Sequence, residues 1–257
     1  MSRNPQPPPH IDLWDDLAVV VSALGSVAAH AHASSAFVVG LDREFHVGQR
    51  GAWRRTHGAW IPAGCHHRLE CDEGLMAIIY PMGPPHGSGE LLRSLRPERV
   101  EALRDHLRAA VRGRLSRQEI RNGLRVRLSA TDRRVTHPAR IDPRVIASLE
   151  LLRTAPDQAQ SVAGVAEMIG LSATRLMHLF KKELGVPFRK VRNWERLRHV
   201  VVQHAAGESL TMASLSAGYA DSSHLSRAFK GMFGISASTV LNSQTRVRIA
   251  DPDDRSP

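Results

Sequence analysis

Two short sets of polar and basic side chains near the end of the sequence have the chemistry needed to contact DNA bases. Arg227 can donate two hydrogen bonds to the O6 and N7 atoms of guanine, which discriminates against other bases by about 1–3 kcal/mol. Serine hydroxyls and histidine rings can bond to base edges or phosphates, and methionine can contact a thymine methyl group. The base-contact candidates are Thr174, Arg175, Met177 and His178 in one set and Ser222, Ser223, His224, Ser226 and Arg227 in the other.

Lys181 and Lys182 follow the first set, and Lys230 follows the second, at about one helical turn, while Arg189 and Arg192 lie further along, in the stretch between the two sets. A helix lying in the major groove passes the sugar–phosphate backbone at such positions, where contacts fix the register of the protein without reading the sequence. The phosphate-contact candidates are Lys181, Lys182, Arg189, Arg192 and Lys230.

These side chains belong to a pattern that occurs twice, with an offset of 209 − 161 = 48 positions at its start. Ser161 and Ser209 are candidate N-caps of short helices that stop at Gly170 and Gly218. A second helix is expected to begin near Ser172 in the first copy and near Ser222 in the second. The inward stripes of these second helices are Leu176, Leu179 and Phe180, and Leu225, Ala228 and Phe229. Each copy is therefore expected to be a helix-turn-helix unit, whose second helix enters the groove.

An amphipathic stretch from Phe188 to His204 separates the two units. About sixteen helical residues span roughly 24 Å, and such a rod can hold two reading helices about one DNA turn, or roughly 34 Å, apart.

Residues from about 141 to 241 resemble the DNA-binding domain of AraC-type (AraC/XylS family) transcriptional regulators. The matching segments are GLSATRLMHLFKKELGVPF and GYADSSHLSRAFKGMFGIS, and the second contains the Ser-x-x-x-Ser-Arg-x-Phe element as Ser222, Ser226, Arg227 and Phe229. The resemblance implies two helix-turn-helix subdomains joined by a long helix. Thr211 and Ser214 are more polar than the family norm, and Ala237 replaces a common proline, which predicts either a looser second unit or a weaker sequence preference there.

The charge distribution also places the DNA contacts in the second half of the chain. Lys and Arg minus Asp and Glu gives 6 − 8 = −2 for residues 1–89, 14 − 6 = +8 for 90–140, 14 − 8 = +6 for 141–250 and 1 − 3 = −2 for 251–257. A nearly neutral front followed by a basic back is expected when only the back meets a polyanion. Cys65 and Cys71 do not form a disulfide framework, and acidic residues precede the apolar stretch at Leu17–Ala29. We therefore expect a cytoplasmic protein with no membrane contact.

Short apolar segments between Ala36 and Tyr80, separated by Gly and Pro, predict a small β-barrel or sandwich. The segment GAWIPAGCHHRLE is similar to the cupin-like sensor domain that often precedes AraC-type DNA-binding domains. The expected fold class is α+β in two domains. The predicted divisions are a disordered arm (1–14), a cupin-like β domain (15–89), an interdomain helix and basic connector (90–140), a double helix-turn-helix domain (141–245) and a tail (246–257). Within the double domain, 161–185 is the first unit, 186–206 the linker helix and 209–234 the second unit.

Four histidines of the β domain, His46, His57, His66 and His67, raise the question of a metal site. His66 and His67 point to opposite faces if they share a strand, and the glutamate spacing of a metal-binding cupin is missing. The prediction is therefore no metal, no cofactor and no catalytic residue. Trp53, Trp60, Met76 and Tyr80 are expected in the core, with a small apolar pocket as the alternative.

The leading hypothesis is a sequence-specific regulator, not an enzyme, that reads two adjacent major-groove segments of promoter DNA. Its other expected partners are a small-molecule effector, RNA polymerase and a second copy of the chain. The helix expected at 97–112 either pairs with its twin in a dimer or packs within its own chain. A metal-dependent cupin-type enzyme tethered to DNA, which predicts His57 and His67 as essential, and a constitutive DNA binder without effector are the alternatives.

Overall fold

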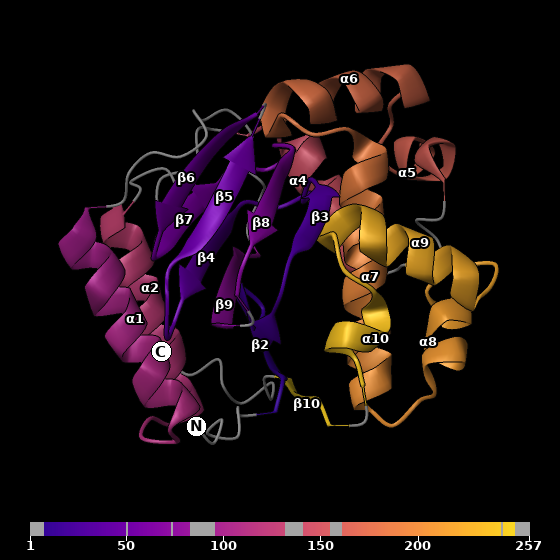
Figure 1. The fold of residues 1–257 in the computed structure, drawn as a ribbon. Coiled ribbons are helices and arrows are strands. Elements are labelled where there is room, and N and C mark those ends of the chain that lie inside the picture. The colour runs from indigo at the N-terminus through magenta and orange to yellow at the C-terminus, as the bar shows by residue number, and fades with distance from the viewer. Residues whose placement is uncertain are drawn as a thin grey trace.

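A computed structural model describes residues 8–49, 51–72, 74–82, 96–131, 141–154, 161–242 and 244–249. Its front half is a β-sandwich and its back half is helical (Figure 1), which confirms the expected α+β class. The strands form two sheets and not a closed barrel, within the part of the chain that is described.

The larger sheet has the order β10-β1-β2-β9-β4-β7, and the smaller has the order β3-β8-β5-β6. The strands are β1 (His10–Leu13), β2 (Leu17–Leu24), β3 (Val27–His30), β4 (Ala36–Gly40), β5 (Phe45–Gln49), β6 (Ala52–Thr56), β7 (Gly58–Ile61), β8 (His67–Glu70), β9 (Gly74–Pro81) and β10 (Arg246–Ile249). Apolar side chains from both sheets, among them Val38, Phe45 and Leu69, form one buried cluster between them. Trp60, Met76 and Tyr80 are buried as expected, whereas Trp53 is 41% exposed, which corrects its assignment to the core.

Helices α1 (Pro97–Val111) and α2 (Arg117–Thr131) cover the other face of β4. Every residue of β4 is buried because the sandwich core covers one face and these helices cover the other. The apolar stripe of α1, including Leu103, Leu107 and Ala110, packs in one cluster with Phe37 and Val39 of β4. Of the two alternatives for this helix, packing within the chain is therefore the one observed.

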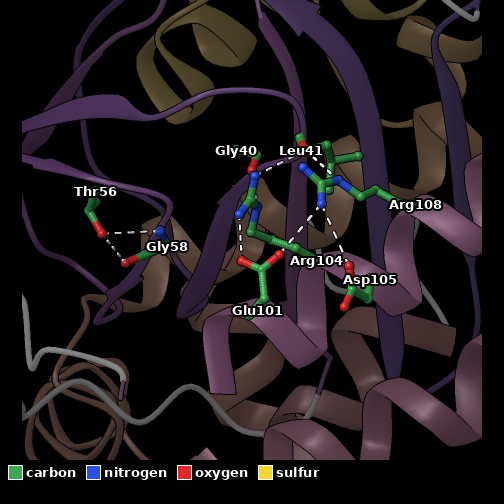
Figure 2. Close-up of polar contacts among 8 residues, drawn as sticks. All are labelled: Gly40, Leu41, Thr56, Gly58, Glu101, Arg104, Asp105 and Arg108. Carbon is green, nitrogen blue, oxygen red and sulfur yellow. Dashed lines mark hydrogen bonds and ion pairs between the residues drawn. The ribbon is translucent and has the colours of Figure 1, made fainter. Parts of the chain in front are cut away.

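Two arginines of α1 fasten the helix to the end of β4 (Figure 2). The Nε atom of Arg104 donates to the Gly40 carbonyl at 3.0 Å, and the Nε atom of Arg108 donates to the Leu41 carbonyl at 2.7 Å. Glu101 lies 2.5 Å from the Nη1 atom of Arg104 and neutralises an arginine side chain that is only 7% exposed. The helix is thus held by charge-assisted hydrogen bonds as well as by apolar packing.

Replacing Arg104 with alanine is expected to lower the free energy of unfolding by about 2–3 kcal/mol, because a buried carbonyl loses its charged donor. Urea denaturation of the variant measures this change. Arg112→Ala, at an exposed position at the end of the same helix, is the control and should change stability by less than about 0.5 kcal/mol. Equal stabilities of the two variants would contradict the proposed role of Arg104.

The back half contains α4 (Pro143–Thr154), α5 (Val162–Met168), α6 (Ala173–Leu184), α7 (Phe188–Ala205), α8 (Leu210–Ser216), α9 (Ser222–Phe233) and α10 (Ala237–Val240). As the sequence predicts, α4 begins directly after Asp142, whose carboxylate accepts from the Arg144 backbone N–H at 2.9 Å. No helix in the described part of the chain has the length and apolarity required to cross a bilayer.

The two halves are packed together along a long seam. Trp194 and Leu197 of α7 share a buried cluster with Ile11, Leu13 and Tyr80 of the larger sheet. Strand β10 pairs in parallel with β1, with Ile11 opposite Val247. The last described strand therefore lies beside the first one in the same sheet. The Arg248 guanidinium lies 2.5 Å from Asp12, which is buried.

This pairing corrects two sequence predictions. Residues 10–13 are a strand and not part of a disordered arm over 1–14, and residues 246–249 are a strand and not part of a solvated tail over 246–257. Alternation of polar and apolar residues over four positions is too weak a signal for either strand, since each is stable only when paired with a neighbouring strand, β2 and β10 for β1 and β1 for β10. Residues 1–7 and 250–257, and the expected linker at 83–89, lie outside the described residues.

Candidate nucleic-acid interface

Both helix-turn-helix units are built from the same local signals. Ser161 caps α5 by accepting from the Gly164 N–H at 3.0 Å, and Ser209 caps α8 by accepting from the Met212 N–H at 3.2 Å. The turns follow at Gly170 and Gly218, with φ of 70° and 79°, a region in which glycine is favoured. The predicted caps and turns are therefore confirmed.

The second helices, α6 and α9, also begin and end alike. The side chain of Ser172 caps α6, and that of Asp221 caps α9 with a hydrogen bond of 2.6 Å from the His224 N–H. Both helices end at a left-handed glycine, Gly185 and Gly234. The sequence repeat is thus a repeat of structure.

The inward stripes and the outward faces separate as the sequence predicts. Leu176, Leu179 and Phe180 are at most 2% exposed, and Leu225 and Phe229 at most 5%, while Ala228 is partly buried. All nine base-contact candidates are exposed, namely Thr174, Arg175, Met177, His178, Ser222, Ser223, His224, Ser226 and Arg227. In each unit, the second helix therefore has a polar outward face and an apolar inward face.

His224 has an additional local role. Its Nδ1 atom accepts from the Ala220 N–H at 3.4 Å, and its ring stands on the edge of the Tyr219 ring at 5.2 Å between centroids. This leaves the Nε2 atom for a contact outside the chain.

Ser214, which is more polar than the residue usual at this position of the family, is fully buried, and its hydroxyl donates to the Thr211 carbonyl at 2.7 Å. The bracing helix α8 therefore accommodates the serine without an unpaired hydroxyl.

The phosphate-contact candidates lie at the C-terminal ends of the reading helices and on α7. Lys181, Lys182, Arg189 and Lys230 are exposed, and Arg192 is half-buried. The Lys181 ammonium donates to the Gly185 carbonyl at 3.0 Å. Burial lowers the pKa of Arg192, and the neighbouring cations Arg196 and Arg189 lower it further. A phosphate bound here would relieve that repulsion, as in a site built for an anion.

Helix α7 joins the cores of both units. Its first turn contributes Phe188 and Val191 to the core of the first unit, while Trp194, Leu197 and Val200 belong to the core of the second. Its 18 residues span about 27 Å. Figure 1 shows α6 lying across one end of α7 and α9 lying further along it. One rigid helix thus fixes the spacing of the two reading helices.

Close to the end of α9 the structure places a group of three buried histidines that the sequence prediction missed. One ring nitrogen from each of His30, His32 and His67 lies within 4.8 Å of the other two, and each residue is at most 3% exposed. Burial lowers the pKa of His30 to about 3 and that of His67 to about 4, so these rings are neutral at pH 7. His32, also buried, has its pKa lowered in the same direction.

Of the four histidines singled out in the sequence, only His67 belongs to this group. His66 is exposed, which confirms that the adjacent rings point to opposite sides, and His46 and His57 are not members. The missed signal is the His-x-His spacing of His30 and His32, since residues two apart in an extended chain share a face. Cys65 and Cys71 are free thiols.

Residues 165–243 match the family model HTH_18, described as a helix-turn-helix domain. A search of curated proteins found no match. Among solved structures, ToxT from Vibrio cholerae O395 superposes with a TM-score of 0.56 at 12% identity, over 88% of this chain and 97% of that one. ToxT bound to an unsaturated fatty acid, from Vibrio cholerae strain SCE256, gives a TM-score of 0.55 at 12% identity, over 88% and 95%. At this identity the likeness shows the shared two-domain fold.

The matched family model covers α6 to α10 and so includes the polar faces of both reading helices. Together with the doubled units and the shared α7, this confirms the resemblance seen in the sequence. Residues 165–243 are thus a helix-turn-helix domain, and in the full chain two such units stand behind a β-sandwich, in an architecture similar to that of ToxT.

Proposed function

We propose that the protein binds promoter DNA by placing α6 in one major-groove segment and α9 in the next, on the same side of the duplex. The observation that carries this proposal is that two similar polar faces project from cores which share α7. Arg175 and Arg227 then read base edges, and the lysines at the helix ends contact phosphates. Regulation reaches the two units through the seam with the β-sandwich.

Electrophoretic retardation on the DNA upstream of the protein's own gene tests this proposal. Saturable binding that survives competitor DNA is the expected result, and binding to all DNA with equal affinity would contradict it. The readout is best made at several salt concentrations, because phosphate contacts release counterions.

Lys182→Ala should weaken binding about equally on every sequence and reduce the slope of log K against log salt by about one unit. Lys182 is exposed, and its ammonium lies 3.3 Å from Glu183, a surface ion pair of little strength. Arg112→Ala, which removes an exposed cation of α1 outside the DNA-reading units, is the control and should leave the slope unchanged. A slope that does not move in Lys182→Ala would remove this residue from the phosphate contacts.

The seam contains an apolar cavity suited to a small effector. Its lining includes Ile78 and Tyr80 from the sandwich and Trp194, Phe229 and Phe233 from the helical half. Arg198 is the only arginine or lysine among the described lining residues, and its Nε atom lies 2.9 Å from Glu195. A fatty acid, as named for ToxT, would therefore have to compete with an existing ion pair for its carboxylate. A thermal-shift series separates an effector-controlled protein from a constitutive binder.

The remaining partners follow from the family resemblance. Contact with RNA polymerase and pairing with a second copy are part of the proposal, although the apolar stripe of α1 packs internally and does not supply the dimer surface. We do not propose a metal-dependent enzyme that uses His57 and His67, because the structure does not bring these two residues into one group.

A further inference from the structure

The three buried histidines lie where the sandwich meets the ends of both reading helices. On one side, the Ala28 N–H donates to the carbonyl of Gly234, the residue directly after α9, at 3.2 Å. On the other, the Gly64 N–H donates to the His32 carbonyl at 2.8 Å, and Gly64 packs against Val186, just beyond the end of α6. Figure 1 shows β3, which ends at His30, beside α9.

Two of the three rings, those of His30 and His67, are oriented in the way that metal-binding histidines are. The Nδ1 atom of His30 lies 2.8 Å from the Ala28 carbonyl, and that of His67 lies 3.0 Å from the Cys65 carbonyl. A carbonyl only accepts, so both Nδ1 atoms carry the proton and both Nε2 atoms present a lone pair. Backbone carbonyls that fix the tautomer in this way are the usual outer partners of metal-ligating imidazoles.

Two ring nitrogens of the group are left with unsatisfied hydrogen-bonding capacity. His67 Nε2 and His32 Nδ1 are buried side-chain atoms with no hydrogen-bond partner. His32 Nε2 lies 2.9 Å from His30 Nε2 and 3.3 Å from the Tyr80 hydroxyl. A buried polar atom without a partner costs about 1–3 kcal/mol, so two such atoms in one group of rings need an explanation.

Packing alone is a poor explanation, because apolar side chains would fill the same space without that cost. A metal ion is a better one. Nitrogen atoms bound to one zinc-like ion at about 2.0–2.1 Å lie roughly 3.3 Å apart, and one nitrogen from each of the three rings already lies within 4.8 Å of the others. Three neutral imidazoles also form a known ligand set that leaves a fourth position open.

An ion can enter from the side of His67. This residue lines a surface pocket together with Gln49, Trp53 and His66. The group contains no carboxylate, and the positive charge of Lys190 on α7 acts on His30 and His32. Hard cations that prefer oxygen ligands, such as Mg²⁺ and Ca²⁺, are therefore excluded, and metals with high affinity for imidazole are selected.

We propose that His30, His32 and His67 bind one divalent transition-metal ion of the Zn²⁺, Co²⁺ or Ni²⁺ class, and that this ion controls DNA binding through the end of α9. The ring of His30 is bonded to the Ala28 carbonyl, and the N–H of the same residue, Ala28, is bonded to Gly234. The His32 ring also lies 6.1 Å from the ring of Phe233, the last residue of α9. Rotation of these rings onto an ion therefore moves groups that contact α9 directly. This inference rests on the proposed function for its regulatory consequence, but not for the site itself.

The site is tested without DNA. The full chain is treated with a chelator and titrated with Co²⁺, and the d–d absorption of the bound ion is recorded. We expect one ion per chain, the same affinity in His66→Gln, and an affinity lower by at least about tenfold in His67→Gln and His30→Gln. Absence of saturable Co²⁺ binding, or wild-type affinity in His67→Gln, would overturn the site.

A variant that replaces His67 with another metal ligand distinguishes loss of the ligand from loss of binding through misfolding. His67→Cys should still bind Co²⁺ and should add a thiolate-to-cobalt charge-transfer band, because a cysteine sulfur then joins the ligands. A bound ion without that band would place the metal elsewhere and overturn the assignment of His67.

The regulatory consequence is tested by DNA retardation with Zn²⁺ and with chelator. The wild type should change its affinity for DNA by at least about threefold between the two conditions, and His67→Gln should not change. An equal metal response in both proteins would overturn control through this site. DNA binding by the chelated wild type tests the proposed function separately, so the two proposals can fail independently.

Discussion

Replacing Phe180 with alanine is expected to lower the free energy of unfolding by about 3–5 kcal/mol, the largest loss anticipated for any single change in the first reading unit. Phe180 is fully buried, and its ring meets the ring of Phe188 edge-on at 5.0 Å between centroids. The change leaves a cavity between α6 and the start of α7, so the helix that carries the exposed polar face loses packing that holds it in place. Chemical denaturation followed by circular dichroism measures the loss.

The control for this prediction is Met177→Ala on the same helix. Met177 is 46% exposed and contributes little to the core, so its removal should cost less than about 1 kcal/mol. If Phe180→Ala were no less stable than Met177→Ala, the first unit would not be organised around the inward stripe of α6.

Arg227→Ala is expected to weaken binding to the preferred DNA by about 1–3 kcal/mol, roughly 5- to 150-fold, and to relax the preference at one base pair. Arg227 lies on the exposed face of α9, opposite the buried Leu225 and Phe229. Binding to unrelated DNA should weaken far less, since that binding depends on charge. Retardation on a set of single-base variants of the site measures both effects.

Arg227→Lys separates the two roles that this side chain can have. Lysine keeps the charge but cannot make the two parallel hydrogen bonds of a guanidinium, so the lysine variant should lose discrimination and keep non-specific affinity. Restoration of the full sequence preference by lysine would show that Arg227 contacts only phosphate.

The sequence predicted the two reading units well because their signals are local. Caps such as Ser161 and turns such as Gly170 act within one or two helical turns, and the apolar stripe is visible at helical spacing. The exposed positions follow from the same periodicity. Which of these exposed side chains contact bases, and which contact phosphates, stays a prediction.

The features that the sequence did not predict depend on residues far apart in the chain. Strand β10 exists because it pairs with β1, more than 230 positions earlier, as the Arg248–Asp12 ion pair shows. The histidine group likewise needs β3 and β8 to be neighbours in the smaller sheet, which places His67 opposite His30. Only the spacing of His30 and His32 was available beforehand. No local propensity reports such pairings.

Hydroxyl-radical footprinting of the bound promoter fragment tests the central claim most directly, because it maps where each reading helix meets the duplex. Two reading helices held by α7 predict two protected segments on one face, about 10 base pairs apart, with Arg175→Ala altering one segment and Arg227→Ala the other. A single protected segment, or the same segment altered by both variants, would contradict the proposal that α6 and α9 read adjacent grooves.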